Sequence, residues 1–112
     1  MSRDQRRAVR KRTDYTAVVT DMISGQPFGQ LGNLSASGML VISANPPRSE
    51  AIYQLRLPLS GLGRTPQHIE VGVQEQWQEQ AATPGQVWAG YRIVAISSED
   101  NARLQAWLAL PS

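Results

Sequence analysis

Six short apolar segments, separated by residues that favour turns, most limit how this chain of 112 residues can fold. In "AIYQLRLPL" (51–59) the leucines recur at every second position, the period of a strand with one buried face. Stretches such as "ANPPRSE" (44–50) interrupt the series, because proline cannot donate to a sheet ladder. The expected strands cover residues 16–20, 29–34, 38–43, 51–59, 68–77 and 87–96. This pattern predicts a mostly β domain, a small antiparallel barrel.

The final segment, "SSEDNARLQAWLAL", has the pattern of a helix rather than a strand. Either serine of the pair 97–98 can cap its N-terminus, and two acidic residues follow in the first turn, where the helix dipole favours them. Leu104, Trp107 and Leu108 are spaced to share one apolar face. We therefore expect a helix over residues 98–110 that packs against one end of the barrel.

The length of 112 residues indicates a single domain. Apolar residues make up 41% of the chain, and there is no cysteine, which excludes disulfides and thiolate metal sites. No apolar run approaches the roughly 20 residues that a membrane span needs. The basic N-terminus lacks the apolar stretch of a signal peptide. We expect a cytoplasmic protein that is not inserted in a membrane.

The positive charge is concentrated at one end of the chain. The formal net charge is only +2, yet residues 1–12 hold six of the eleven basic residues and a single acid, Asp4. Such a charged, apolar-poor segment is expected to be a flexible arm. The chain is therefore divided into a basic arm, residues 1–12, and a barrel domain, residues 13–112. A local site for an anion fits this distribution better than a broad basic face.

Residues with catalytic potential are few. The single histidine, His68, has no second histidine or cysteine with which to share a metal ion. Glu70, Glu75 and Glu79 are spaced like the outward positions of a strand rather than like a paired acid and base. The chain contains neither a complete nucleophile elbow nor a complete P-loop. We therefore expect a binding protein rather than an enzyme, with no metal and no cofactor.

The stretch "NLSASGML" combines polar turn residues with a glycine. Asn33 and Ser35 bond readily to nearby backbone groups or to the edges of a ligand. Gly38 tolerates a positive φ and the close approach of a second backbone or of a ligand. Taken alone, the stretch is also what an ordinary tight connection between two strands requires.

The arm contains arginines at a regular interval. Arg6 and Arg10 are four residues apart, and each guanidinium has planar paired donors that match a phosphate or the O6 and N7 edge of guanine. Taken alone, this cluster also fits a solvated basic tail with residual affinity for nucleic acid. Arg3 and Arg7 have the same spacing, but Arg6 and Arg10 lie nearer the first expected strand.

Together and in this order, the two stretches resemble the PilZ domain family, receptors for the bacterial second messenger cyclic di-GMP. "RRAVR" (6–10) matches the family's RxxxR element, and "NLSASG" (33–38) matches its [D/N]-x-S-x-x-G element. "WAGYRIVAI" (88–96) resembles the G-x-[RF] strand that closes such barrels. The resemblance spans nearly the whole chain, including the C-terminal helix.

The resemblance implies a six-stranded barrel whose arm folds over its mouth. Arg6 and Arg10 would reach the guanine edges and the phosphates, and Arg7 would add a phosphate or stacking contact. The ligand-binding residues implied by the resemblance are Arg6, Arg7, Arg10, Asn33, Ser35, Gly38 and Trp77.

The remaining implied residues lie on the barrel. Asn33 and Ser35 would contact the other guanine or its phosphate, and Gly38 would leave room at the turn. Trp77, at the end of the fifth strand, would lie beside the ligand, although a core or rim tryptophan fits this position equally well.

The resemblance implies a stand-alone adaptor that signals to an unidentified protein partner in motility, biofilm or exopolysaccharide control. A second hypothesis is a PilZ-like module that binds proteins but no nucleotide. A nucleic-acid binder is the third, and it is disfavoured because Trp88, Tyr91 and Trp107 are expected in the core rather than on a stacking surface.

Overall fold

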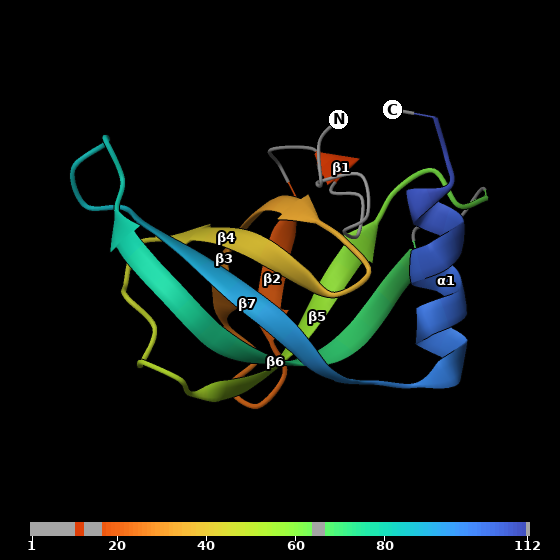
Figure 1. Ribbon diagram of the computed structural model, residues 1–112, viewed down its shortest axis with the longest axis horizontal. Helices are drawn as coiled ribbons and strands as arrows, with labels where there is room; N and C mark the ends of the chain where they lie inside the picture. The colour runs from red at the N-terminus through yellow and green to blue at the C-terminus, as the bar shows by residue number, and fades with distance from the viewer. Residues whose placement is uncertain (1–10, 13–16, 64–66, 112) are drawn as a thin grey trace, which may run out of the picture.

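The computed structural model describes residues 11–12, 17–63 and 67–111 (Figure 1). Its elements follow the order β1 (Lys11–Arg12), β2 (Val18–Asp21), β3 (Pro27–Leu34), β4 (Gly38–Ser43), β5 (Ile52–Leu59), β6 (Gln67–Gln80), β7 (Val87–Ile96) and α1 (Ser98–Leu108). The helix α1 is too short and too polar to span a membrane, and it is the only helix of the described residues.

Six of these strands close into an antiparallel barrel. The strands pair in the order β3, β2, β5, β6, β7 and β4, and β4 pairs back onto β3. The long strands β6 and β7 curve around the barrel, as Figure 1 shows. The predicted fold, a mostly β six-stranded antiparallel barrel with a C-terminal helix, is confirmed.

The barrel interior is filled by alternate side chains of its strands. Leu55, Leu57 and Leu59 of β5 are fully buried, as the period of two predicts. They join a single apolar cluster to which the other strands and the helix contribute. The helix is capped by Ser97, whose side chain accepts a hydrogen bond from the Asp100 N–H, and it buries Leu104 and Trp107 in the same cluster.

Two sequence-based expectations about side-chain direction are wrong. Glu75 does not face outward with Glu70. It lies inside the barrel, 2% exposed, because it follows Glu70 by five positions, and an odd separation on a strand puts the two side chains on opposite faces. Trp88 is not a core residue but is 40% exposed, because its neighbours on β7, Val87 and Ala89, occupy the inward positions. Tyr91 and Trp107 are buried, as expected.

β1 is a short strand added to the barrel rather than part of its closed ring. Lys11 pairs with Leu34, and Arg12 pairs with Asn33, at the end of β3 that leads into the turn before β4. The last two residues of the expected arm are therefore held in the sheet.

Candidate functional site

A row of residues crosses four strands on the outer surface of the barrel. Asn33 of β3 pairs with Leu40 of β4, Leu40 pairs with Gly90 of β7, and Gly90 pairs with Trp77 of β6. We call these four residues the outer row. Since neighbouring strands are about 4.8 Å apart, the outer row is about 14 Å long. The register thus brings Asn33 and Trp77, 44 positions apart in sequence, onto one face.

Trp77 lies at the β6 end of the outer row, over a glycine. A Cβ atom on Gly90 would collide with the indole, so the absence of a side chain there makes room for the ring. Trp77 is 48% exposed, which leaves part of the indole open to solvent. An exposed indole on a flat strand surface can stack on a purine or pack against another apolar group.

Ser35 is part of the turn that joins β3 to β4. It is 1% exposed, and its hydroxyl donates to the Gly38 carbonyl (3.2 Å) and accepts from the N–H groups of Ser37 (3.3 Å) and Gly38 (3.1 Å). The Ser37 carbonyl in turn accepts from Ile93 N–H of β7 (2.8 Å). The three hydrogen bonds of the Ser35 hydroxyl use its one donor and two acceptor positions. Direct contact of Ser35 with a ligand stays a prediction.

Replacing Ser35 by alanine should destabilise the fold by about 1–3 kcal/mol, because the buried Gly38 N–H and the partly buried Ser37 N–H lose their acceptor. Urea denaturation followed by circular dichroism measures this change. Ser37→Ala is the matched control, since Ser37 lies in the same turn but is exposed. Equal unfolding midpoints for the two variants would show that the Ser35 hydroxyl does not hold the turn.

The close approach expected at Gly38 is made by the backbone of the neighbouring strand β7. It is buried and pairs with Arg92, and a Cβ atom would collide with the Tyr91 carbonyl oxygen. Its φ is not positive, unlike that of Gly25. Glycine is therefore needed here because the β7 backbone leaves no room for a side chain.

Tyr91 lies inside the barrel, next to Gly90 of the outer row. It is 3% exposed, and its ring packs edge-on against Phe28 and Tyr53, with centroids 5.8 and 6.3 Å away. Burial, followed by the nearby Tyr53 and Glu75, raises the pKa of Tyr91 well above its usual range. The phenol therefore remains uncharged at neutral pH, and Tyr91 supports the outer surface by packing.

Sequence reasoning missed three residues of this surface. Leu40 and Gly90 belong to the outer row, and Arg92 lies exposed beside it, where its Nη2 donates to the Gln74 Oε1 atom (3.3 Å). The alternation around Tyr91 predicts that Gly90 and Arg92 face outward. That Gly90 lies in one row with Asn33 and Trp77 depends on the register of four strands, which no local pattern specifies.

The arginines predicted to bind the ligand, Arg6, Arg7 and Arg10, lie outside the described residues, as does Arg3. The adjoining residues Lys11 and Arg12 form β1, at the Asn33 end of the outer row.

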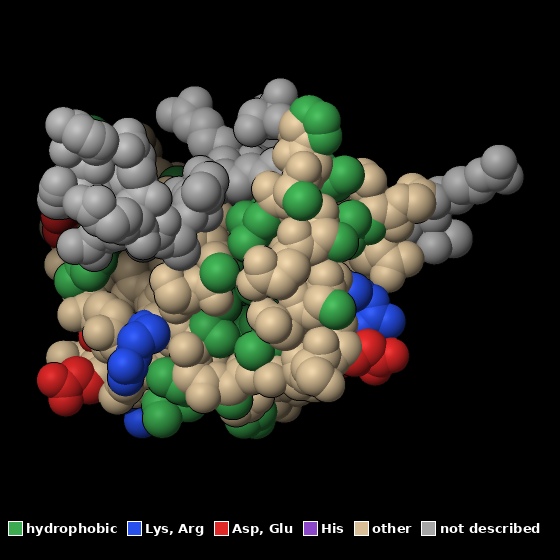
Figure 2. Space-filling model, turned by 45° about the vertical axis from the view of Figure 1, so that its right-hand side comes forward, with side chains coloured by type: hydrophobic (Ala, Val, Ile, Leu, Met, Phe, Trp, Pro, Cys, Tyr) green, Lys and Arg blue, Asp and Glu red, His purple; other side chains and the backbone are tan. Residues whose placement is uncertain are grey.

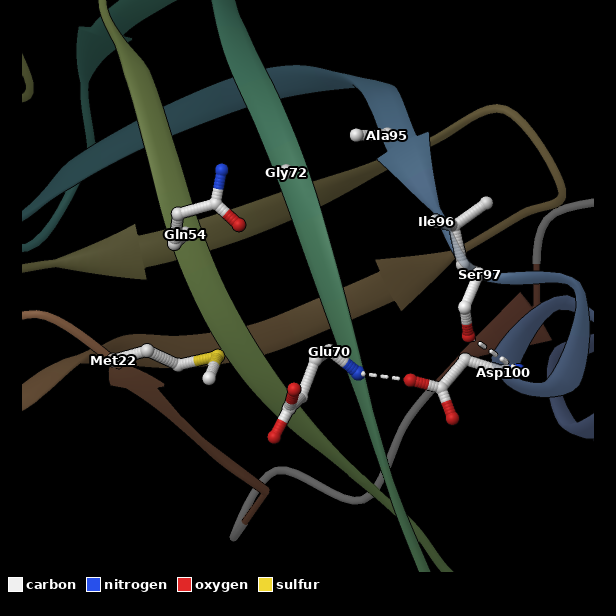
Figure 3. Close-up of a pocket in the computed structure, with 8 residues that line it drawn as sticks. All are labelled: Met22, Gln54, Glu70, Gly72, Ala95, Ile96, Ser97 and Asp100. Carbon is white, nitrogen blue, oxygen red and sulfur yellow. Dashed lines mark hydrogen bonds between the residues drawn. The ribbon is translucent and has the colours of Figure 1, made fainter.

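A second surface feature is a cavity of about 360 Å³ beside the start of α1 (Figure 3). Its lining includes two carboxylates, Glu70 and Asp100, and Asp100 accepts a hydrogen bond from the Glu70 N–H (2.9 Å). The lining residues include no basic side chain. This acidic cavity is poorly suited to an anion.

The basic side chains of the described residues do not form one patch on the face that Figure 2 shows. On the side drawn in Figure 2, basic groups are scattered and lie close to acidic ones. Two arginines, Arg56 and Arg103, form ion pairs with nearby carboxylates. No group of three potential metal ligands occurs within the described ranges.

Comparison with protein families identifies the domain. Residues 4–110 match the model of the PilZ domain. The chain belongs to the PilZ domain family. The resemblance based on the two motifs is therefore confirmed, and PilZ domains are binding and adaptor modules rather than enzymes.

Solved structures show the same fold. The inhibitor of motility MotI/DgrA of Bacillus subtilis is similar with a TM-score of 0.75 at 16% identity, over 96% of this PilZ domain and 50% of that chain. The PilZ domain of Escherichia coli YcgR with c-di-GMP gives a TM-score of 0.58 at 16% identity, over 90% and 86% of the two chains. The present chain thus spans about half the length of MotI/DgrA. No curated protein matches it.

Proposed function

We propose that this PilZ domain is a receptor for cyclic di-GMP that acts as an adaptor and not as an enzyme. The observation that carries the proposal is the position of β1 at the Asn33 end of the outer row. Lys11, which follows Arg10 in the sequence, pairs with Leu34, and Arg12 pairs with Asn33. In this proposal the two family motifs, 23 positions apart from Arg10 to Asn33, act at one place on the surface.

Each predicted residue then has a distinct role. Arg6 and Arg10 bind phosphates and guanine edges, and Arg7 adds a further phosphate or stacking contact. Asn33 offers its amide to a guanine at one end of the outer row, and Trp77 stacks on a base at the other end. The roughly 14 Å between these two strand positions suits a dinucleotide better than a single nucleotide.

Ser35 and Gly38 support this site through the backbone. The Ser35 hydroxyl holds the turn that follows Asn33, and Gly38 lets β4 approach β7 closely. Their place in the family motif is consistent with maintaining the shape on which Asn33 depends, in addition to any contact with the nucleotide.

Binding would signal through an order transition of the arm. Two phosphates neutralise the mutual repulsion of the arginines and attach the arm to the barrel, at an entropic cost that reduces the affinity. The ordered arm presents a new surface to a protein partner. The likeness to an inhibitor of motility supports motility as the regulated process, with biofilm or exopolysaccharide control as further outputs of the same kind.

Calorimetric titration with cyclic di-GMP tests the function. We expect saturable binding by the intact chain and none with GMP at the same concentration. No heat and no change in any backbone amide resonance would favour the alternative, a PilZ-like module that binds proteins only.

Trp77→Ala should weaken cyclic di-GMP binding by about 5- to 150-fold, since stacking on an aromatic side chain contributes roughly 1–3 kcal/mol. Trp88→Ala is the matched control, because Trp88 is similarly exposed but lies outside the outer row. The measurement is the dissociation constant from calorimetry. Equal losses for both tryptophans would contradict a base stacked on Trp77.

A further inference from the structure

Trp77 faces outward because β6 contains a bulge. Glu75 and Trp77 are two residues apart, so on a regular strand both side chains would lie on one face. Instead, Glu75 pairs with the inward-facing Tyr91, and Trp77 pairs with Gly90, only one residue along β7. Gln76 is the extra residue, and it reverses the face on which the next side chain lies. Whatever holds this bulge decides whether the indole reaches the outer row.

Glu75 is the buried side chain of the bulge. It is 2% exposed, and its Oε1 atom accepts from the Glu50 N–H (2.8 Å) while its Oε2 atom accepts from Gln78 Nε2 (3.0 Å). The ion pairs found among the described residues do not include Glu75. A buried carboxylate whose partners are N–H donors depends strongly on each of them, because an unsatisfied charge is costly to bury.

The donors tie the bulge to the loop before β5. Gln78, just after the bulge, also donates to the Pro47 carbonyl (3.0 Å). Gln74, just before it, donates through Nε2 to the Glu50 carbonyl (3.0 Å). Glu75 lies between these two glutamines, so strand and loop form one hydrogen-bonded unit on both sides of the extra residue.

The backbone of Glu50 shows how firmly this unit is held. Its φ is 61°, and it is the only described residue other than glycine with a positive φ. This conformation is unfavourable for a residue with a Cβ atom and persists where surrounding contacts impose it. The Glu75 carboxylate supplies one such contact through the Glu50 N–H.

We infer that Glu75 is a positioning residue for Trp77: its buried carboxylate, bound to Glu50 and Gln78, fixes the bulge that turns the indole onto Gly90. The inference concerns the free protein, and it deepens the proposed function only where Trp77 stacks on the nucleotide. Neither motif of the family includes Glu75 or its two partners.

The test uses the free protein of 112 residues labelled with nitrogen-15. Glu75→Gln keeps the shape of the side chain but places an amide group against the Gln78 amide. We expect the Trp77 indole N–H resonance, assigned with Trp77→Phe, to shift and its nuclear Overhauser contact to Gly90 to be lost. The indole resonances of Trp88 and Trp107 should stay in place.

Glu79→Gln is the matched control. It removes the same charge from the same strand at an exposed position that pairs with Trp88, so it should move only the Trp88 resonance. An unchanged Trp77 resonance and Gly90 contact in folded Glu75→Gln would overturn the inference. If Glu75→Gln does not fold, Gln78→Ala decides, with a smaller Trp77 shift expected and no shift contradicting the role.

Nucleotide binding provides a separate readout. Any loss of cyclic di-GMP affinity caused by Glu75→Gln should disappear in a Trp77→Ala background, because both changes remove the same contact. If the protein binds no nucleotide at all, the proposed function fails, while the indole resonances still test the positioning role.

Discussion

Replacing Gly38 by alanine should lower the free energy of unfolding by about 2–3 kcal/mol, because a Cβ atom there collides with backbone that cannot move freely. The obstructing atom is the Tyr91 carbonyl oxygen of β7. This strand pairs with every residue of β4, from the Gly38–Arg92 pair to the Ser43–Val87 pair. A shift of either strand disturbs this ladder and the turn that Ser35 holds. For a domain of this size, the melting temperature should fall by about 10 °C.

Gly32→Ala is the control for this experiment. A Cβ atom on Gly32 has the Leu40 Cδ2 atom as its nearest neighbour, at 3.3 Å, and the end of a leucine side chain can rotate away. Thermal and urea denaturation of both variants should therefore separate them clearly. If Gly38→Ala unfolds at the same midpoint as Gly32→Ala, the close approach of β4 and β7 is not what requires a glycine.

Arg10→Ala should reduce affinity for cyclic di-GMP by about 10- to 150-fold, because a charge-assisted hydrogen bond in a shielded site contributes roughly 1.5–3 kcal/mol. Arg10 is the arginine of the motif nearest to β1 and hence to Asn33. Calorimetry gives the dissociation constant for each variant. Stability should not change, which denaturation of the free proteins can check.

Arg3→Ala is the matched control, since it removes the same charge from the same arm. With Arg6 and Arg10 as the binding pair, Arg3→Ala should leave affinity nearly unchanged. The reverse outcome, a large loss for Arg3→Ala and none for Arg10→Ala, would assign the motif to Arg3 and Arg7. Similar small losses for both would mean that the arm contributes only general charge.

The strands were predictable because one face of each is buried. The segments 38–43 and 87–96 match β4 and β7 residue for residue, and the leucines of β5 all lie inside. Alternation is a local signal, so it is readable wherever a strand is regular. The sequence offers Ser97 and Ser98 as candidates for the N-cap of the helix, and Ser97 is the residue that caps α1.

The two errors concern side chains that regular alternation places on the opposite face from the one expected. The outward positions predicted from the spacing of Glu70, Glu75 and Glu79 are wrong for Glu75, which lies an odd number of positions from Glu70 and therefore faces inward. The expected core position of Trp88 is wrong because Val87 and Ala89 take the inward positions. The bulge at Gln76, which turns Trp77 outward, has no local signature in the amino-acid sequence.

The candidate site could be named from the sequence only through the family resemblance. Asn33 and Trp77 meet on one face because of strand register, which depends on contacts distant in sequence. The family resemblance names Asn33 and Trp77 as site residues but does not show that they lie on one face of the barrel. It includes Gly90 and Arg92 in the strand that closes the barrel but does not place them or Leu40 at the site, and their positions there follow from their neighbours across the sheet.

The most direct test of the account is a titration of the nitrogen-15-labelled protein with cyclic di-GMP, followed by backbone amide resonances. Binding as proposed should shift the amides of the outer row, Asn33, Leu40, Gly90 and Trp77, together with those of the arginine arm. An absence of shifts at saturating nucleotide, or shifts confined to the acidic cavity beside α1 around Gly72 and Ala95, would contradict it.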